Sequence, residues 1–563
     1  MFGHPWVYIV VLPAMSMASQ IIPTFSRRPL VGYGYVASAT VAVGLIGFMV
    51  WAHHMFATGM AMSTMAFFSS ASMMISIPSA ITVFAWIATI WLGRPVIRTA
   101  FLFMIGFLII FVIGGVSGVM TGSAPFDWQL TQSYFVVAHL HYVLIGINLF
   151  PVFGAIYYWF PKFTGRLMDE RVGRVSFWIM FAGFNIGFFP MHIVGMLGMP
   201  RRIYTYPAGL GWSGWNLLIT AGAFLFALGV LLKLVNMLRS WRAGAPAGAN
   251  PWKAATLEWS IPSPPPAYNF SSIPHVASRE PLWESTAEPE RTVLNRGPAL
   301  EHGHEVMTTT FWRAKAIGAL MMPGDSESPF YLALATLVVF EAVLWQQWIP
   351  AAAAFLAAIA ALGAWQWPRR DAARAPVELP RDPHPLGQWA MVLLIATEVA
   401  LFASLFFAWA YLSYESKTWS QHPAPALSLP AVNTVVLLLS SIALHWGLKR
   451  ARGGSASQMR GALAVTIALG VIFVTLQGWE YAHQGFGPAT DAYGSAFIII
   501  TGIHGAHVIV GLLMLGFVAL TVGHHPGDGA RRRAGVVALY WHFVDVVWLT
   551  LFGVLYVAPH FTR

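Results

Sequence analysis

The chain has 563 residues, of which 57% are hydrophobic and only 10% are charged, with a formal net charge of +10 and no cysteine. Soluble domains carry about 25% charged residues, so this composition excludes an ordinary soluble protein and indicates that lipid surrounds most of the chain. The lack of cysteine excludes disulfides, thiolate catalysis and cysteine-ligated metals in this chain. The basic residues lie in short loops between apolar runs, as in membrane proteins, so we expect no nucleic acid partner.

Apolar runs recur along the chain, and each is long enough to cross a bilayer as a helix. The first part predicts seven such helices, over residues 5–25, 36–57, 67–92, 99–121, 133–160, 174–196 and 212–238. A polar, proline-rich stretch over 243–326 predicts an extramembrane linker. Seven more runs follow, over 328–346, 349–366, 386–414, 428–448, 460–483, 490–522 and 534–558. The sequence therefore predicts an all-α integral membrane protein of about fourteen transmembrane helices, in two bundles of seven.

The loops of the first part alternate in charge. Some hold basic residues, such as Arg27 and Arg28, whereas ATGMAMSTM and TGSAPFDWQLTQ hold no Lys or Arg. This alternation follows the positive-inside rule and predicts a cytoplasmic linker. The motif GMPRR breaks the pattern by placing Arg201 and Arg202 on the outer side. A guanidinium pair there suits anionic carboxylates such as haem propionates, although an ordinary exposed pair is the alternative.

Histidines at membrane depth are functional candidates, and a cluster of five lies in three helices of the first part. His4 opens the first helix, His53 and His54 lie in WAHHMFATG, and His139 and His141 lie in SYFVVAHLHYV. On an α-helix, residues two apart point about 200° apart, so the last two histidines could serve two different metal centres. Neighbours are about 100° apart, so the adjacent pair could share one ion with a third imidazole, a set that suits copper. Packed histidines or a proton relay remain alternatives.

The motifs FGHPWVY, WAHHMFATG, SYFVVAHLHYV, GMPRR and NPWKAATLEWSIPSPPPAYNF resemble the second half of subunit I of haem–copper oxidases, over residues 1–276. Residues from 327 onward resemble subunit III, so the chain looks like a bacterial subunit I–III fusion in the inner membrane. The resemblance implies domains at 1–242 and 327–563, with the linker at 243–326 between them. It assigns these roles: His4, His53 and His54 ligate copper B; Tyr8 is cross-linked to His4; His139 and His141 are axial ligands of the high-spin (a3-type) and low-spin (a-type) haems; Arg201 and Arg202 bind haem propionates.

In the subunit III-like part the resemblance implies a structural, proton-entry or lipid-binding bundle without a redox cofactor. The residues at family positions there are Glu398, Glu480, His504, His507, His542 and Asp545.

The sequence departs from the family pattern at four places. The first five helices of subunit I are absent, so we expect a missing N-terminal part to supply the other ligand of the low-spin haem. Trp6 replaces the glutamate of the usual HPEVY motif, and Thr82 replaces a channel lysine. Thr131 and Gln132 replace the His–Asp pair of a magnesium site, which we expect to be weak or absent, while Asp127 is retained near a propionate.

The resemblance implies an enzyme, the catalytic core of a cytochrome c oxidase. It would reduce O₂ to water with proton uptake and pumping, using electrons from cytochrome c through a separate subunit II that carries copper A. One alternative is a quinol oxidase, and an alternative of another class is a truncated, non-catalytic membrane scaffold.

Overall fold

The computed structural model describes residues 3–266, 269–270, 274, 276, 278–284, 305–309, 316–321, 326–367, 386–416, 419, 424–450, 456–522 and 529–561. Within these residues, thirteen helical segments are long and apolar enough to cross a membrane, and one shorter apolar helix spans Ser328–Leu344. The predicted all-α membrane fold is therefore confirmed. Most of the predicted linker beyond residue 266 lies outside the described residues, although two short strands, β1 (Glu305–Thr309) and β2 (Ala316–Met321), pair within it.

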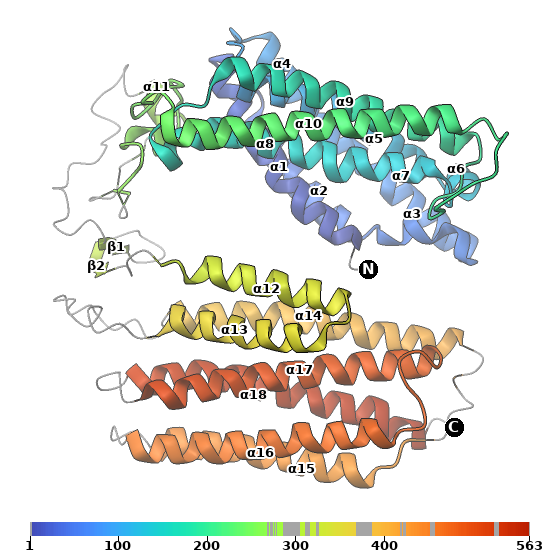
Figure 1. The fold of residues 1–563 in the computed structure, drawn as a ribbon, viewed down its shortest axis with the longest axis vertical. Coiled ribbons are helices and arrows are strands. Elements are labelled where there is room, and N and C mark those ends of the chain that lie inside the picture. The colour runs from blue at the N-terminus through green and yellow to red at the C-terminus, as the bar shows by residue number, and fades with distance from the viewer. Residues whose placement is uncertain are drawn as a thin grey trace. The chain divides into compact units, whose positions relative to one another are not determined.

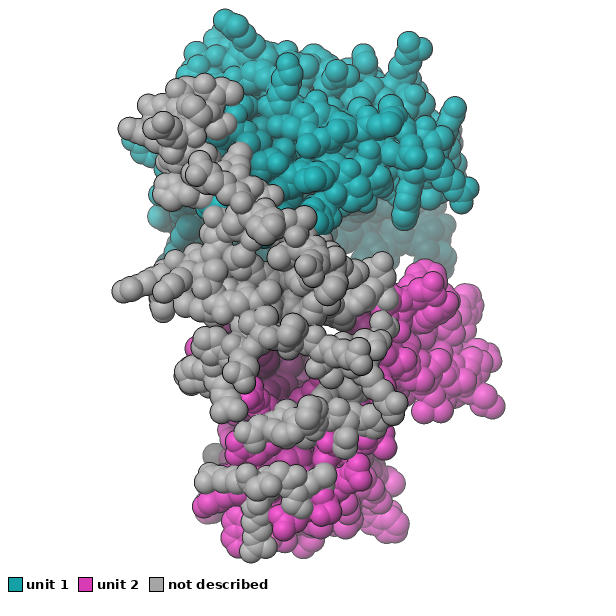
Figure 2. Space-filling view, turned by 90° about the vertical axis from the view of Figure 1, so that its left-hand side faces the viewer, with its two compact units in different colours: residues 1–319 teal, residues 320–563 magenta. Residues whose placement is uncertain are grey.

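The chain forms two compact units, residues 1–319 and 320–563, which are coloured separately in Figure 2. Unit 1 contains a bundle of helices that run nearly parallel or antiparallel to one another (Figure 1). Its α-helices are α1 (Gly3–Ser26), α2 (Tyr33–Gly47), α3 (Met62–Met74), α4 (Ser76–Trp91), α5 (Thr99–Thr121), α6 (Ala124–Leu130), α7 (Tyr134–His141), α8 (Ile147–Thr164), α9 (Glu170–Met196), α10 (Ser213–Ala243) and α11 (Pro281–Glu284).

Three of the predicted spans are not uniform α-helices. The second contains α2 and then a 3₁₀-helix, η1 (Trp51–Thr58), which ends at Gly59 with a φ of 86°. The third contains α3 and α4 in succession. The fifth contains α7, a π-helical turn η2 (Tyr142–Gly146), and α8. Pro151 lies inside α8, five residues after the end of this π-turn.

Glycines allow α9 and α10 to approach closely. A Cβ atom on Gly222 would lie only 2.2 Å from the backbone nitrogen of Gly187, and one on Gly183 would lie 2.4 Å from the nitrogen of Phe226. In a membrane the hydrophobic effect does not drive helices together, so close backbone contact through small residues supplies much of their attraction. This pair of helices forms one wall of unit 1.

The chain after α10 folds back onto unit 1. The indole N–H of Trp252 donates to the backbone oxygen of Tyr158 at 2.8 Å, and that of Trp259 donates to the Tyr158 hydroxyl at 2.9 Å. Lys162 at the end of α8 donates to the Ile261 carbonyl at 2.7 Å. Both tryptophans are buried, so the first part of the predicted linker is docked on the end of α8.

Unit 2 is a second helical bundle. Its helices are α12 (Ser328–Leu344), α13 (Trp348–Gln366), α14 (Leu386–Glu415), α15 (Ser428–Arg450), α16 (Ala456–His483), α17 (Ala492–Thr521) and α18 (Gly529–Leu551), which continues into the π-turn η8 (Phe552–Val557) and the 3₁₀-turn η9 (Ala558–His560).

Polar pairs cross between the helices of unit 2. His507 Nε2 lies 3.0 Å from a Glu398 carboxylate oxygen, and the Ser441 hydroxyl donates to the Asp545 carboxylate. His542 Nδ1 is 2.9 Å from the same Ser441 hydroxyl. Such pairing is expected, because an unsatisfied polar group at membrane depth is costly.

Glu480 and His504 find partners as well. One carboxylate oxygen of Glu480 accepts from Gln477 at 3.1 Å and the other from Gln484 at 3.2 Å. His504 is buried, with its Nε2 3.2 Å from the Val544 carbonyl oxygen. The six residues singled out in this part of the sequence, Glu398, Glu480, His504, His507, His542 and Asp545, thus each contact a neighbouring polar group.

Candidate metal centre

Three imidazoles from two separate elements of unit 1 converge. His4 lies in the first turn of α1, and His53 and His54 lie on the 3₁₀-helix η1. His54 Nε2 is 3.2 Å from His4 Nδ1 and 3.1 Å from His53 Nε2. One ligand atom from each of the three lies within 4.8 Å of the others, and no other group of three His, Asp or Glu side chains in the described residues is as close.

The 3₁₀ winding changes how the adjacent histidines share a site. A 3₁₀-helix has about 3.0 residues per turn, so neighbours are about 120° apart rather than the 100° of the predicted α-helix. The His53 and His54 ring centroids are nevertheless 4.3 Å apart with an interplanar angle of 73°. The two rings therefore bend toward one point, as the sequence predicted, from a backbone that it did not predict.

A serine on α3 fixes the proton on His53. The Ser72 hydroxyl donates to the Phe68 carbonyl at 2.6 Å, so toward His53 Nδ1, 2.7 Å away, it acts as an acceptor. The Nδ1 atom then carries the proton and Nε2 presents a lone pair to the other two rings. This is the neutral tautomer that a metal needs.

Tyr8 packs beside His4, one helical turn further along α1. The two ring centroids are 4.7 Å apart at an interplanar angle of 64°. Gly47 makes room for the phenol, because a Cβ atom there would lie 2.7 Å from Tyr8 Cγ. His4 Nε2 is buried and makes no hydrogen bond. The Tyr8 ring thus lies against the edge of a histidine whose second nitrogen is unpartnered.

His139 and His141 lie on opposite flanks of α7. His139 faces α5, where a Cβ atom on Gly118 would lie 3.0 Å from its Cε1 atom. His141 stacks on Phe188 of α9, with centroids 4.5 Å apart. The structure therefore directs these two rings toward different neighbours, as expected for residues two apart on a helix.

The same tautomer recurs at both rings of α7. The Ser117 hydroxyl donates to the Gly114 carbonyl at 3.0 Å and therefore accepts from His139 Nδ1, also 3.0 Å away. His141 Nδ1 lies 2.7 Å from the Val137 carbonyl oxygen, which can only accept. Both histidines keep the Nε2 lone pair free to bind iron.

The arginine motif lies beside Gln132, in the segment that follows α6, the short helix that carries Asp127. Arg201 Nε donates to the Gln132 side-chain oxygen at 3.1 Å, and the Arg201 backbone N–H donates to the Gln132 carbonyl at 2.9 Å. Arg202 adopts a positive φ of 65°, so it forms a tight turn in the loop. Gln132, at the position of a magnesium-binding residue in the family, is thus engaged with an arginine.

Asp127 is buried between α5 and α7. Burial raises the pKa of its carboxyl from 3.8 to about 6, although a hydrogen bond from Thr131 and the positive charge of Arg201 act in the opposite direction. The Oδ2 atom is buried and has no hydrogen-bond partner. A buried, unsatisfied carboxyl oxygen beside arginines is an open position for a polar ligand or an ordered water.

The residues fit the groups that the resemblance implies. Three imidazole nitrogens that face only one another, without a carbonyl acceptor between them, are suited to hold a copper ion. His139 and His141 each offer one Nε2 lone pair, which is what an axial haem ligand provides.

Four residues around the candidate metal centre were not predicted from the sequence to lie there. Ser117 and Gly118 contact the His139 ring, and Ser72 contacts the His53 ring. His192 on α9 is also buried, with an unpartnered Nε2, and packs on Phe135. The signal for His192 was a histidine within the apolar run FFPMHIVGM.

Trp6 and Thr82, the two residues that replace proton-channel residues of the family pattern, offer no titratable group. Trp6 is exposed on α1. Thr82 is fully buried on α4, and its hydroxyl donates to the Pro78 carbonyl at 3.2 Å. Neither side chain can release a proton in the accessible pH range.

Comparison with known proteins identifies two families in one chain. Residues 1–225 match cytochrome c and quinol oxidase polypeptide I, and residues 384–559 match cytochrome c oxidase subunit III. The heme-copper oxidase subunit I+III of Aeropyrum pernix is 31% identical over 582 aligned positions, which cover 99% of this chain and 70% of the relative. The chain belongs to the haem–copper oxidase subunit I+III family.

Other relatives of this oxidase chain match its first part. Cytochrome c oxidase subunit 1 of Bacillus subtilis is 41% identical over 346 residues, covering 61% of this chain and 53% of the relative. The chain thus spans about half the length of that relative. A solved haem–copper terminal oxidase dimer shares 21% identity with a TM-score of 0.40, over 43% of this chain and 48% of that one.

The two matched regions contain different sets of the polar residues described above. The five candidate ligand histidines, His192 and both arginines of GMPRR lie within residues 1–225, the part similar to subunit I. The Glu398–His507 and Ser441–Asp545 pairs lie within residues 384–559, the part similar to subunit III. The converging imidazoles and the interhelical carboxylate pairs therefore lie in regions that are similar to different oxidase subunits.

Proposed function

We propose that this chain forms the oxygen-reducing centre of a respiratory haem–copper oxidase that reduces O₂ to water. The observation that carries the proposal is the convergence of His4, His53 and His54: His54 Nε2 lies 3.2 Å from His4 Nδ1 and 3.1 Å from His53 Nε2, and all three ligand atoms lie within 4.8 Å of one another. Three neutral imidazoles form a site that suits copper and leaves a coordination position open.

The bound copper and haem iron would supply electrons and an open coordination position for O₂. The chain's own residues orient and protect this site. Ser72 and Ser117 hold the protons of His53 and His139 on Nδ1, and Gly118 leaves room for the His139 ring. The Tyr8 hydroxyl, beside His4, is the nearest phenolic proton donor on the same helix. Arg201 and Arg202 would hold haem propionates by charge-assisted hydrogen bonds.

We further propose cytochrome c as the electron donor, acting through a separate subunit II that carries copper A. The chain has no cysteine, so it cannot itself hold the cysteine-ligated copper A site. His141 would supply one axial ligand of the low-spin haem. Because Trp6 and Thr82 carry no titratable proton, protons for water formation would arrive through hydroxyls and ordered waters in a bacterial inner membrane.

Replacing either adjacent histidine tests the proposal in the purified membrane complex that contains this chain. We expect His53→Ala and His54→Ala to lose copper and O₂ consumption while retaining haem, because His139 and His141 remain in place. Copper is measured by atomic spectroscopy, haem by its optical spectrum, and turnover with an oxygen electrode. His483→Ala, an exposed histidine of unit 2, is the matched control and should keep all three.

Two outcomes would contradict the proposal. Turnover that survives His53→Ala or His54→Ala would exclude these residues as copper ligands. A wild-type complex with no CO-binding haem would instead support the non-catalytic scaffold.

A further inference from the structure

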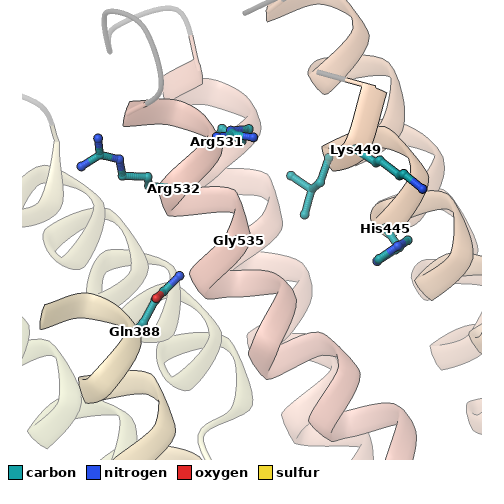
Figure 3. A pocket seen from close by; sticks show the side chains of 7 residues that line it. Gln388, His445, Lys449, Arg531, Arg532 and Gly535 are labelled. Carbon is teal, nitrogen blue, oxygen red and sulfur yellow. The ribbon is translucent and has the colours of Figure 1, made fainter. Parts of the chain in front are cut away.

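The two ends of unit 2 differ in charge. At one end, Lys449 of α15 and Arg531 and Arg532 of α18 line a pocket (Figure 3). The positive-inside rule predicts that this basic end is cytoplasmic. Helix α16 follows α15 in the chain and lies beside it (Figure 1), so the two are antiparallel and α16 ends on the opposite, outer side.

Side-chain oxygens gather where α16 ends. Gln477, Glu480 and Gln484 are three and four residues apart, so they share one face, and both glutamines donate to the Glu480 carboxylate. The Tyr556 hydroxyl, on the π-turn η8, lies close to Glu480 and Gln477. We call these four residues the outer oxygen cluster. Part of it thus rests on a π-turn, and such turns occur frequently at functional sites.

The outer oxygen cluster has acceptors that no protein group satisfies. Gln477 Oε1, Gln484 Oε1 and the Tyr556 hydroxyl are buried without a hydrogen-bond partner. The Gln477 side chain is only 4% exposed and Tyr556 is 0% exposed. Buried polar atoms in proteins nearly always have a partner, and an amide oxygen can only accept. The cluster therefore needs a donor or a cation.

Neighbouring hydroxyls do not supply the missing donors. The Tyr481 hydroxyl donates to Thr501 Oγ1 at 2.8 Å, and the Thr501 hydroxyl donates in turn to the Phe497 carbonyl at 2.6 Å. Both hydroxyl protons are thus directed away from the outer oxygen cluster.

The Glu480 carboxylate also lies far from the basic side chains of its unit. The Lys and Arg side chains that the structure describes in unit 2 all lie at the basic end: Lys449, Arg460, Arg531, Arg532 and Arg533. An ionised carboxylate at membrane depth is costly unless a positive charge is paired with it. The same place thus lacks both a countercharge and partners for its amide oxygens.

A monovalent cation would satisfy these groups together. It would balance the single carboxylate charge, whereas a divalent ion would leave a net positive charge in a medium of low dielectric. A half-turn of each glutamine amide would bring its oxygen toward the ion. Carboxylate and amide oxygens are ligands of hard cations and not of soft transition metals. We propose that the outer oxygen cluster, centred on Glu480, is a sodium-binding site.

The test uses the full membrane complex in detergent, with choline chloride replacing NaCl at constant ionic strength. We expect Na⁺ to raise the melting temperature with a saturable dependence, because an ion bound only by the folded state stabilises it. Ca²⁺ at equal concentration should have a smaller effect. Equilibrium dialysis with radioactive Na⁺ measures the bound ion directly. Loss of a group that merely supports a metal ligand weakens binding about 10- to 100-fold, so Glu480→Gln, which removes the charged ligand, should weaken it at least about tenfold.

Two further variants separate a built site from general surface charge. Glu415→Gln removes an equal charge from an exposed residue at the outer end of α14, and should leave Na⁺ binding unchanged. Gln477→Glu adds a second carboxylate to the outer oxygen cluster. We expect this variant to prefer Ca²⁺ over Na⁺, because the charge of its ligands then matches a divalent ion.

Three results would overturn the proposal. Equal melting temperatures in Na⁺ and in choline would indicate that a proton, rather than a metal ion, neutralises Glu480. Unchanged Na⁺ binding in Glu480→Gln would place the ion elsewhere, and an equal loss in Glu415→Gln would indicate diffuse attraction. Circular dichroism of each variant checks that the helices are intact, and its copper and haem contents check that unit 1 is unchanged.

Discussion

At the scale of single residues, the metal centre depends on where imidazole protons are held. His53 and His139 each give their Nδ1 proton to a serine, and His141 gives its own to a carbonyl. Each serine hydroxyl donates its proton to a carbonyl of its own helix, so toward the imidazole ring it can only act as an acceptor. The neighbouring hydroxyls thus decide which nitrogen is free to bind metal.

Ser72→Ala is expected to weaken copper binding about 10- to 100-fold, because loss of such a hydrogen bond to a ligand typically has this effect. The His53 ring would lose its orientation and its fixed tautomer. Titration against a competing chelator measures the affinity. Ser69→Ala is the control, since its hydroxyl lies on the same helix but donates to the Gly122 carbonyl at 2.9 Å. An equal loss in both variants would show that the serine contact with His53 is unimportant.

The buried carboxyl of Asp127 should make stability depend on pH. Its pKa is raised from 3.8 to about 6 by burial, so between these values the folded chain holds a proton that the unfolded chain has released. Stability should therefore fall as pH rises from about 4 to about 6, and level off above that. Asp127→Asn cannot titrate and should lack this slope in melting temperatures measured from pH 4 to 7. An unchanged slope in the variant would assign the effect to another group.

At the scale of elements, hydropathy was enough to predict the spans but not their internal winding. The 3₁₀-helix WAHHMFAT and the π-turn YVLIG both lie within predicted apolar runs, so hydropathy does not distinguish them from α-helix. The end of α2 at Gly47 brings that glycine against the Tyr8 ring. Contacts between distant segments set these details, and they are not local in the sequence.

At the candidate site, too, the sequence predicts some residues and not others. The motifs identified all five histidines and Tyr8, because imidazoles are rare at membrane depth and their spacing is distinctive. The roles of Ser72 and Ser117 were not visible, since each lies about twenty residues from its histidine and serine is common in membrane helices. Hydroxyl partners become recognisable only when the helices are packed.

Gly222→Ala should separate α9 from α10, because the added methyl would lie 2.2 Å from the Gly187 backbone nitrogen. Overpacking of this kind costs about 1–3 kcal/mol. Thermal unfolding of the purified complex should show the loss. Gly214→Ala, on the same helix, meets nothing within 4 Å and serves as the control. Equal melting temperatures for the two variants would refute the close packing of these helices.

At the scale of the whole molecule, the positions of basic loops predict which ends of the bundles face the cytoplasm. The chain has no cysteine, so single introduced cysteines report sidedness without background. Tyr204→Cys, on the fully exposed outer loop, should react with a membrane-impermeant maleimide in intact cells. Ala245→Cys, just after α10, should react only after permeabilisation. Labelling of both in intact cells would contradict the proposed orientation.

The π-turn at Tyr142–Gly146 holds one surplus residue between the ligands of α7 and the proline of α8. Removing that residue would restore even winding and swing His139 and His141 about 100° around the helix axis, while α8 kept its place. A single codon gained or lost at this point can therefore re-aim both of the proposed haem-ligating histidines together, leaving their identity and spacing untouched.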